Sequence, residues 1–195
     1  MIKEFALEPD AITSSYRDFC YLTEKFGVSQ GRVISEFPSK WRRMVLESAE
    51  REHRGKVELT KIVERLRSLK GEIVFSAGRP GGDSSKDWLS RALEEHARQR
   101  FSAIIARENQ TDHSDVLVAS NLDGENQHLN QANQRRIART AEEIVDCILL
   151  LLSSTKAVKL IDPYFDPCKP RFRRMLERVL AVLRENKARV TLEIH

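Results

Sequence analysis

The sequence predicts an α/β protein in which a mixed or parallel sheet is flanked by helices, with an N-terminal helical subdomain. From Val57 onward, short apolar segments of strand length alternate with longer segments whose apolar residues recur at helical spacing. This alternation is typical of a sheet with helices on its faces. Before Val57 helical spacing dominates, so we expect a helical subdomain over residues 1–55 and an α/β domain over residues 56–195.

Two helices are expected in the N-terminal segment. The first has Asp10 or Thr13 as its N-cap, runs through Phe26 and ends at Gly27. The second runs from Ser39 to His53, since Ser39 can cap it and the preceding proline fixes its entry. The segment between them, VSQGRVISEFP, is interpreted as a loop or a short helical turn.

The elements after residue 56 follow from the change of period along the chain. An amphipathic helix begins at Val57 and ends at Gly71. The later helices are Trp88–Arg98, Gln131–Ser154 and Pro170–Glu185, and the strands are Glu72–Ser76, Phe101–Ala106, Asp115–Ser120, Val158–Asp162 and Val190–Ile194.

Composition limits the class of protein. With 33 Lys and Arg against 29 Asp and Glu, the net charge of +4 permits a nucleic-acid partner without requiring one. Cys20, Cys147 and Cys168 are too widely spaced for a disulfide framework or a zinc site, so no metal and no cofactor is predicted. The apolar run Ile148–Leu152 is far shorter than the ~20 residues that span a bilayer. We expect a cytoplasmic protein without a signal peptide or a membrane partner.

Two loops carry residue types that occur at functional sites. The loop Gly78–Lys86 follows a predicted strand and precedes a helix, but Gly82 is followed by Asp83 where a phosphate-binding loop needs Lys. We therefore interpret it as a connection with Ser84 or Ser85 as helix N-cap. The segment Arg107–Asp115 is interpreted as a solvated turn between strands.

Clusters of cations lie at the starts of two predicted helices. They are Arg135, Arg136 and Arg139 at the long helix, and Lys169, Arg171, Arg173 and Arg174 at the helix after the turn DPYFDP. Cations at a helix N-terminus oppose the helix dipole, so we interpret them as candidate nucleic-acid-binding residues that contact phosphates. The alternative is an ordinary charged helix face paired with Glu142, Glu143 and Glu177.

The C-terminal segments VKLIDPYFDP, RFRRMLERVL and VTLEIH form a strand, a turn, an amphipathic helix and a second strand. This unit resembles the first half of a phospholipase D-like domain. Upstream, SKDWLSRALEEH and FSAIIA extend the resemblance to a bacterial group of such proteins associated with phage-defence and mobile-element genes.

The resemblance implies metal-free phosphodiester chemistry. In that family two H-x-K-x-x-x-x-D motifs converge: one histidine attacks phosphorus, the other is the general acid, and the lysines hold phosphate oxygens. Here His53, His96, His113 and His128 are each followed two positions later by a residue other than Lys, and His195 is the last residue. No catalytic residue is therefore assigned. His53, His96 and His128 are interpreted as surface residues.

Two interpretations of this unit remain open. In one, the chain is the N-terminal part of a longer natural chain that supplies the missing motif and acts as a phosphodiesterase or nuclease. In the other, the fold is used without catalysis as a binding or assembly module. In that case Asp162, Tyr164 and Asp166 are turn-forming residues.

The sequence thus predicts a nucleic-acid-associated protein of prokaryotic antiviral defence or mobile-element type, inactive as a hydrolase over these 195 residues. DNA or RNA is the expected partner. The alternative is a protein-interaction module in which Ile148–Leu152 meets a second copy, as a homodimer, or another protein of a defence system. A further alternative is a metal-dependent nuclease using Asp83, Asp112 or Asp115.

Overall fold

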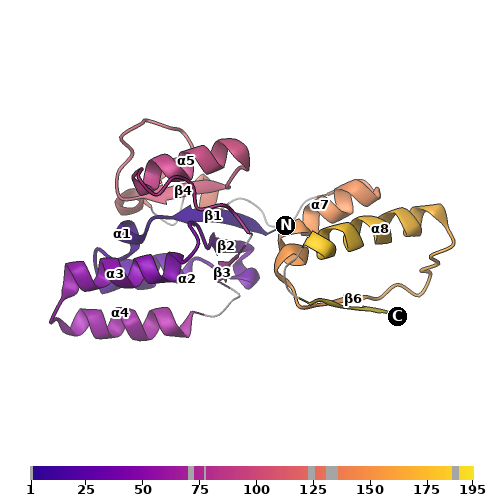
Figure 1. The fold of residues 1–195 in the computed structure, drawn as a ribbon, viewed down its shortest axis with the longest axis horizontal. Helices are drawn as coiled ribbons and strands as arrows, with labels where there is room; N and C mark the ends of the chain where they lie inside the picture. The colour runs from indigo at the N-terminus through magenta and orange to yellow at the C-terminus, as the bar shows by residue number, and fades with distance from the viewer. Residues whose placement is uncertain (1, 70–72, 77, 123–125, 131–135, 186–188) are drawn as a thin grey trace. The chain divides into compact units, whose positions relative to one another are not determined.

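The computed structural model describes residues 2–69, 73–76, 78–122, 126–130, 136–185 and 189–195 (Figure 1). The chain divides into two compact units. The larger unit comprises residues 3–132, and the smaller unit comprises residues 133–195 together with the first two residues.

The larger unit is built on a five-stranded sheet in which all neighbours are parallel. Its strands are β1 (Lys3–Leu7), β2 (Arg32–Ser35), β3 (Val74–Phe75), β4 (Ala103–Ala106) and β5 (Val116–Val118). The order is β3-β2-β1-β4-β5, so the chain builds outward from β1 in one direction and then returns to its other side. Such a reversal between β1 and β4 is a topological switch point.

Helices cover both faces of this sheet. They are α1 (Pro9–Ile12), α2 (Tyr16–Glu24), α3 (Trp41–His53), α4 (Val57–Ser68), α5 (Trp88–Arg98) and α6 (Gln127–Asn130), with short 3-10 turns η1 (Val28–Gln30) and η2 (Ala119–Asn121). Figure 1 shows α3 and α4 on one side of the sheet and α5 on the other.

Alternation along the strands divides the buried side chains between the two faces. Phe5, Leu7 and Ile105 belong to the cluster beneath α2, α3 and α4, whereas Ala6 and Ile104 belong to the cluster beneath α5. All five residues of β1 are buried, as expected of a central parallel strand covered on both faces.

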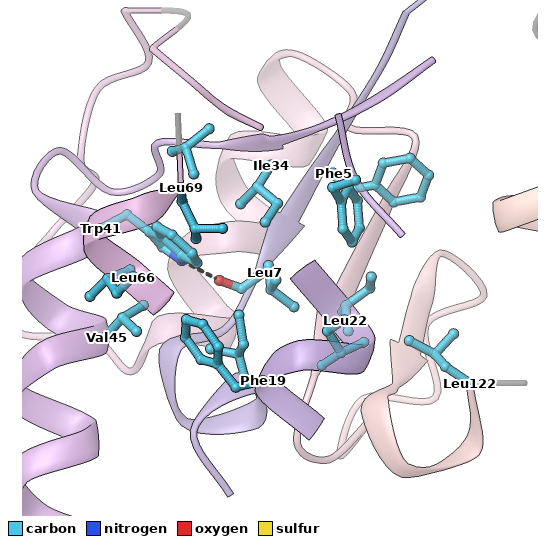
Figure 2. Close-up of a cluster of buried hydrophobic side chains, with 14 of the residues drawn as sticks. Phe5, Leu7, Phe19, Leu22, Ile34, Trp41, Val45, Leu66, Leu69 and Leu122 are labelled. Carbon is cyan, nitrogen blue, oxygen red and sulfur yellow. Dashed lines mark hydrogen bonds between the residues drawn. The ribbon is translucent and has the colours of Figure 1, made fainter. Parts of the chain in front are cut away.

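Figure 2 shows the larger cluster, in which side chains from α2, α3, α4 and the strands converge. Trp41 is fully buried there, and its indole Nε1–H donates a hydrogen bond of 2.6 Å to the carbonyl oxygen of Leu7. The bond joins the first turn of α3 to the last residue of β1. The carboxyl end of β1 is therefore fixed by packing and by a directed hydrogen bond.

The smaller unit consists of α7 (Ala141–Ser154), β6 (Ala157–Leu160), α8 (Pro170–Glu185) and β7 (Thr191–Ile194). The strands β6 and β7 pair in parallel, and α7 packs against α8. Val145 and Leu152 of α7 and Val179 and Leu183 of α8 form its buried core. The predicted strand–helix–strand unit is therefore present.

The α/β class, with a parallel sheet flanked by helices, is confirmed. The first 55 residues differ from the helical prediction, because they contribute β1 and β2 as well as α1, α2 and α3. The strand β1 reads KEFAL, and its two charged residues conceal the apolar run that a central strand usually shows.

The division of the chain also differs from the sequence-based boundary. Gly55 lies between α3 and α4, which pack against each other inside the larger unit. Along the chain, the larger unit ends at residue 132 and the main segment of the smaller unit begins at residue 133. The sequence places the boundary too early because the charged residues at the starts of β1 and β2 conceal two strands of the sheet that the first helices cover.

Candidate functional site

The first group of predicted phosphate-binding residues precedes α7 and does not lie on it. Helix α7 begins at Ala141, and the Thr140 hydroxyl caps it by accepting a 3.2 Å hydrogen bond from the Glu143 N–H. Arg136 and Arg139 are exposed and lie before this cap, while Arg135 lies outside the described residues. The prediction that these arginines open a helix from Gln131 is therefore wrong for Arg136 and Arg139.

The second group lies at the start of α8, as predicted. Lys169 precedes the helix and Arg171, Arg173 and Arg174 lie in its first turns; all four side chains are exposed. The first turn contains no acidic residue, so its cations oppose the helix dipole without local compensation.

Among the residues that the structure describes, carboxylates contact Arg173 and Lys169 of this second group. The Arg173 guanidinium lies 4.0 Å from Glu177 one turn later, and the Lys169 ammonium lies 3.7 Å from Asp166. Both are long contacts between exposed groups, worth about 0–1 kcal/mol in water. The predicted pairing with Glu177 is present but weak, and the cations remain available to a stronger anion.

The positive charge of the whole chain comes from the smaller unit. Residues 133–195 hold 13 Lys and Arg against 8 Asp and Glu, whereas the first 132 residues hold 20 against 21. The excess of Lys and Arg is therefore concentrated in the smaller unit. A local excess of positive charge is typical of a surface that binds a polyanion.

The DPYFDP turn is a pair of aspartate turns. The Asp162 carboxylate accepts a 2.8 Å hydrogen bond from the Tyr164 N–H, and the Asp166 carboxylate accepts one of 2.9 Å from the Cys168 N–H. The two aspartate carbonyls accept from the Phe165 and Lys169 N–H groups, each at 3.0 Å. Both aspartates therefore shape the backbone, as predicted.

Aromatic packing fixes the turn to α8. The rings of Phe165 and Phe172 lie 5.3 Å apart, and the Arg171 guanidinium lies 4.4 Å from the centre of the Phe172 ring. Tyr164, between these residues in the sequence and the aspartate that begins the turn, is 78% exposed. The turn follows β6 and meets the end of β7, where the Asp162 N–H donates to the His195 carbonyl at 3.2 Å.

The loop Gly78–Lys86, considered as a phosphate loop, is held by a buried arginine. The Arg79 side chain is 1% exposed and forms ion pairs with Glu4 at 2.6 Å and Glu95 at 2.8 Å. Its guanidinium also stacks on the Phe101 ring at 4.0 Å. Without Arg79 the buried Glu4 carboxylate would lose both hydrogen bonds from this guanidinium, and Glu95 would keep, among the described residues, only its contact with Arg98, so the Arg79 side chain fixes the loop to the sheet.

The N-cap of the following helix is Asp87, not Ser84 or Ser85. The Asp87 carboxylate accepts hydrogen bonds from the N–H and the hydroxyl of Ser90, at 2.9 and 2.6 Å. These hydrogen bonds lower the pKa of Asp87. Asp83 instead accepts from the N–H and hydroxyl of Ser85, which lowers the pKa of Asp83 in the same way.

The segment Arg107–Asp115 joins β4 to β5 without a helix and is stabilised internally. The Asn109 side-chain amide donates to the carbonyls of His113 and Val116, at 3.1 and 3.2 Å. His113 Nδ1 accepts from the Asp115 N–H at 3.1 Å. These contacts agree with the predicted turn between strands.

Two histidines differ from the surface interpretation. His96 is buried, and its Nδ1 accepts from the Phe101 N–H at 3.2 Å, so Nε2 carries the proton towards Asp115 at 3.0 Å. His53 is also buried, with Nε2 2.7 Å from the carbonyl of Thr13. His128 is half-buried. His96 and His53 are buried because the helices that carry them pack in the larger unit, and the sequence did not predict this packing.

Metal ligation finds no support in the described part of the chain, where no three His, Cys, Asp or Glu side chains converge as metal ligands would. The metal-dependent nuclease alternative names Asp83, Asp112 and Asp115. Each of these aspartates has a different local environment, and Asp83 accepts hydrogen bonds from Ser85. Asp112 is an exposed residue with φ of 50°, and Asp115 is bound to His96.

A polar cluster that the sequence did not reveal lies at the carboxyl ends of β1 and β4, the switch point of the sheet. Glu8 follows β1 and Arg107 follows β4, and the Arg107 N–H donates to the Glu8 carboxylate. Arg107 also lies 3.4 Å from Glu52. Asp10 pairs with Arg51 at 2.6 Å.

Burial raises the pKa of Glu8, and the negative charges of Asp10 and Asp87 raise it further, against the hydrogen bond from Arg107 that lowers it. Perturbed carboxyls at switch points are typical of binding and catalytic sites. Here each carboxylate already has a partner in the fold. The sequence could have indicated this cluster only through the adjacency of β1 and β4, and β1 does not look like a strand in the sequence.

Comparison with protein-family models, with curated proteins and with solved structures finds no significant match to this chain. Among the helices that the structure describes, none combines the length and the hydropathy needed to span a membrane.

Proposed function

We propose that this chain is a nucleic-acid-associated protein, of prokaryotic defence or mobile-element type, that contacts the phosphate backbone through its smaller unit. The observation that carries this proposal is the charge asymmetry. The cationic excess is confined to residues 133–195, and it includes the exposed cations at the start of α8.

The second support is the resemblance of β6, the DPYFDP turn, α8 and β7 to the first half of a phospholipase D-like domain, a family that acts on phosphodiesters. The proposal concerns binding alone. No H-x-K-x-x-x-x-D motif occurs in the chain, so no catalytic residue is assigned.

The test is nucleic-acid binding as a function of salt. Because bound phosphates release counterions, the logarithm of the association constant falls linearly with the logarithm of salt concentration, by about 0.7–0.9 per phosphate contact. We expect the triple variant R171E/R173E/R174E to bind at least about tenfold more weakly and to lower this slope by about two. Fluorescence anisotropy with a labelled oligonucleotide measures both quantities.

The matched control is R17E/R54E/R67E, which changes the same amount of charge at exposed arginines of the larger unit. This control should keep the wild-type slope. Equal losses in the two triple variants, or a wild-type affinity that does not depend on salt, would contradict the proposal. Circular dichroism establishes that both variants are folded.

As a second candidate, we propose self-assembly through α7. The apolar run Ile148–Leu152 divides between the two sides of this helix: Ile148 and Leu152 pack into the core of the smaller unit, whereas Leu149 is partly exposed. Light scattering of the wild type should show a homodimer that L149E dissociates, while the control L180E on α8 remains dimeric. A wild-type monomer at all concentrations would exclude this candidate.

A further inference from the structure

We infer that the cationic site at the start of α8 takes single-stranded rather than duplex nucleic acid, with Tyr164 as a platform on which a base stacks. This inference rests on the proposed function and specifies its substrate class. It depends on the exposure of Tyr164, on the ordered turn that presents it, and on the exposed cations at the start of α8, to which this turn is anchored.

Tyr164 has the most exposed large hydrophobic side chain among the residues that the structure describes. It is 78% exposed, and Ile161, on the same turn segment, is 75% exposed. A tyrosine ring offers a large flat surface, and leaving it in water forgoes the stabilisation that burial would give. An exposed aromatic ring is expected where a ligand covers it.

The backbone that presents Tyr164 is already ordered. The Tyr164 N–H is held by the Asp162 carboxylate at 2.8 Å, and the next residue, Phe165, packs its ring on Phe172 of α8. Binding therefore needs to immobilise only the two side-chain torsions of the tyrosine. This lowers the entropic cost of stacking a base against it.

Cations follow this platform in the sequence, at the start of the helix to which its turn is anchored. Lys169, Arg171 and Arg174 are exposed at the start of α8, to which the turn is anchored. The N–H groups of the first helical turn add a partial positive charge. A nucleotide whose base stacks on the ring thus places its phosphate among positive groups, the combination that single-strand-binding surfaces use.

A duplex fits this surface less well. Its bases are stacked on one another and present only their edges, whereas a single strand can turn a base outward onto an aromatic ring. The neighbourhood also differs from a membrane-binding surface. Its exposed apolar side chains, Ile161, Tyr164 and Ile194, lie on a turn and at a strand end and do not form the apolar face of an interfacial helix.

The experiment compares a labelled oligothymidylate with a duplex of the same length, using anisotropy at fixed salt. We expect tighter binding of the single strand. Tyr164→Ala should weaken it by about five- to 150-fold, the range for loss of one base–aromatic stack, and leave the salt slope unchanged because no cation is removed. Tyr164→Phe keeps the ring and should bind like the wild type.

The controls separate this inference from the proposed function. Val57→Ala, at a large exposed side chain of the larger unit, should have no effect. If the arginine triple variant loses binding while Tyr164→Ala does not, or if the duplex binds more tightly, the single-strand inference is wrong and the proposed function stands. If neither oligonucleotide binds, or if only vesicles of phosphatidylserine and phosphatidylcholine do, both are wrong.

Discussion

At the scale of single residues, buried charges determine how the larger unit is held together. Arg79 links Glu4 on β1 to Glu95 on α5, so the buried negative charge of β1 is neutralised inside the fold. Glu8 differs, because its carboxylate is held chiefly by a backbone N–H at the end of the sheet. Burial disfavours the ionised form of Glu8 and raises its pKa.

Glu8 gives a prediction about pH. Its pKa is raised by burial, so the folded state binds the proton more tightly than the unfolded chain does, and this contribution to stability is lost as pH rises through the folded-state pKa. Glu8→Gln keeps an oxygen that can accept from Arg107 but cannot ionise. The stability of the variant relative to the wild type should therefore increase as pH rises above about 4.5.

Urea unfolding of the wild type and of Glu8→Gln at several pH values measures this difference. Glu50→Gln, at an exposed carboxylate of α3, controls for the loss of one charge. If the stability of Glu8→Gln relative to the wild type stays constant or falls as pH rises, burial does not raise the pKa of Glu8.

At the scale of elements, the sequence predicts the strands β3, β4 and β5 and the helices α5 and α8, but not the strands β1 and β2. The predicted helices Trp88–Arg98 and Pro170–Glu185 have the bounds of α5 and α8. Strands β1 and β2 were missed because each has only four or five residues and carries charge at its start. Their pairing with β3 and β4 gives them strand structure, and that pairing is not encoded in local sequence.

Helix α5 provides a prediction about capping. Asp87→Ala removes the acceptor for the Ser90 N–H and hydroxyl and should destabilise the protein by about 1 kcal/mol. Asp87→Asn retains an acceptor and should cost less. Thermal unfolding of the two variants measures the difference, and equal losses would mean that the carboxylate charge, not the cap hydrogen bond, stabilises this end.

At the scale of the whole molecule, charge is divided unequally between the two units. The larger unit carries almost no net charge and buries Arg79 in ion pairs with Glu4 and Glu95, while the smaller unit carries the cationic excess. The charge pattern and the C-terminal strand–helix–strand unit could be read from the sequence. The strand order, the switch point and the exposure of Tyr164 could not, since each depends on contacts between distant segments.

The most direct test of the account is the salt dependence of oligothymidylate binding by the wild type and by R171E/R173E/R174E. The wild-type affinity should fall steeply with salt between about 50 and 200 mM. The variant should bind more weakly, and the slope of its log association constant against log salt should be smaller by about two. Identical slopes for the two proteins would contradict the account.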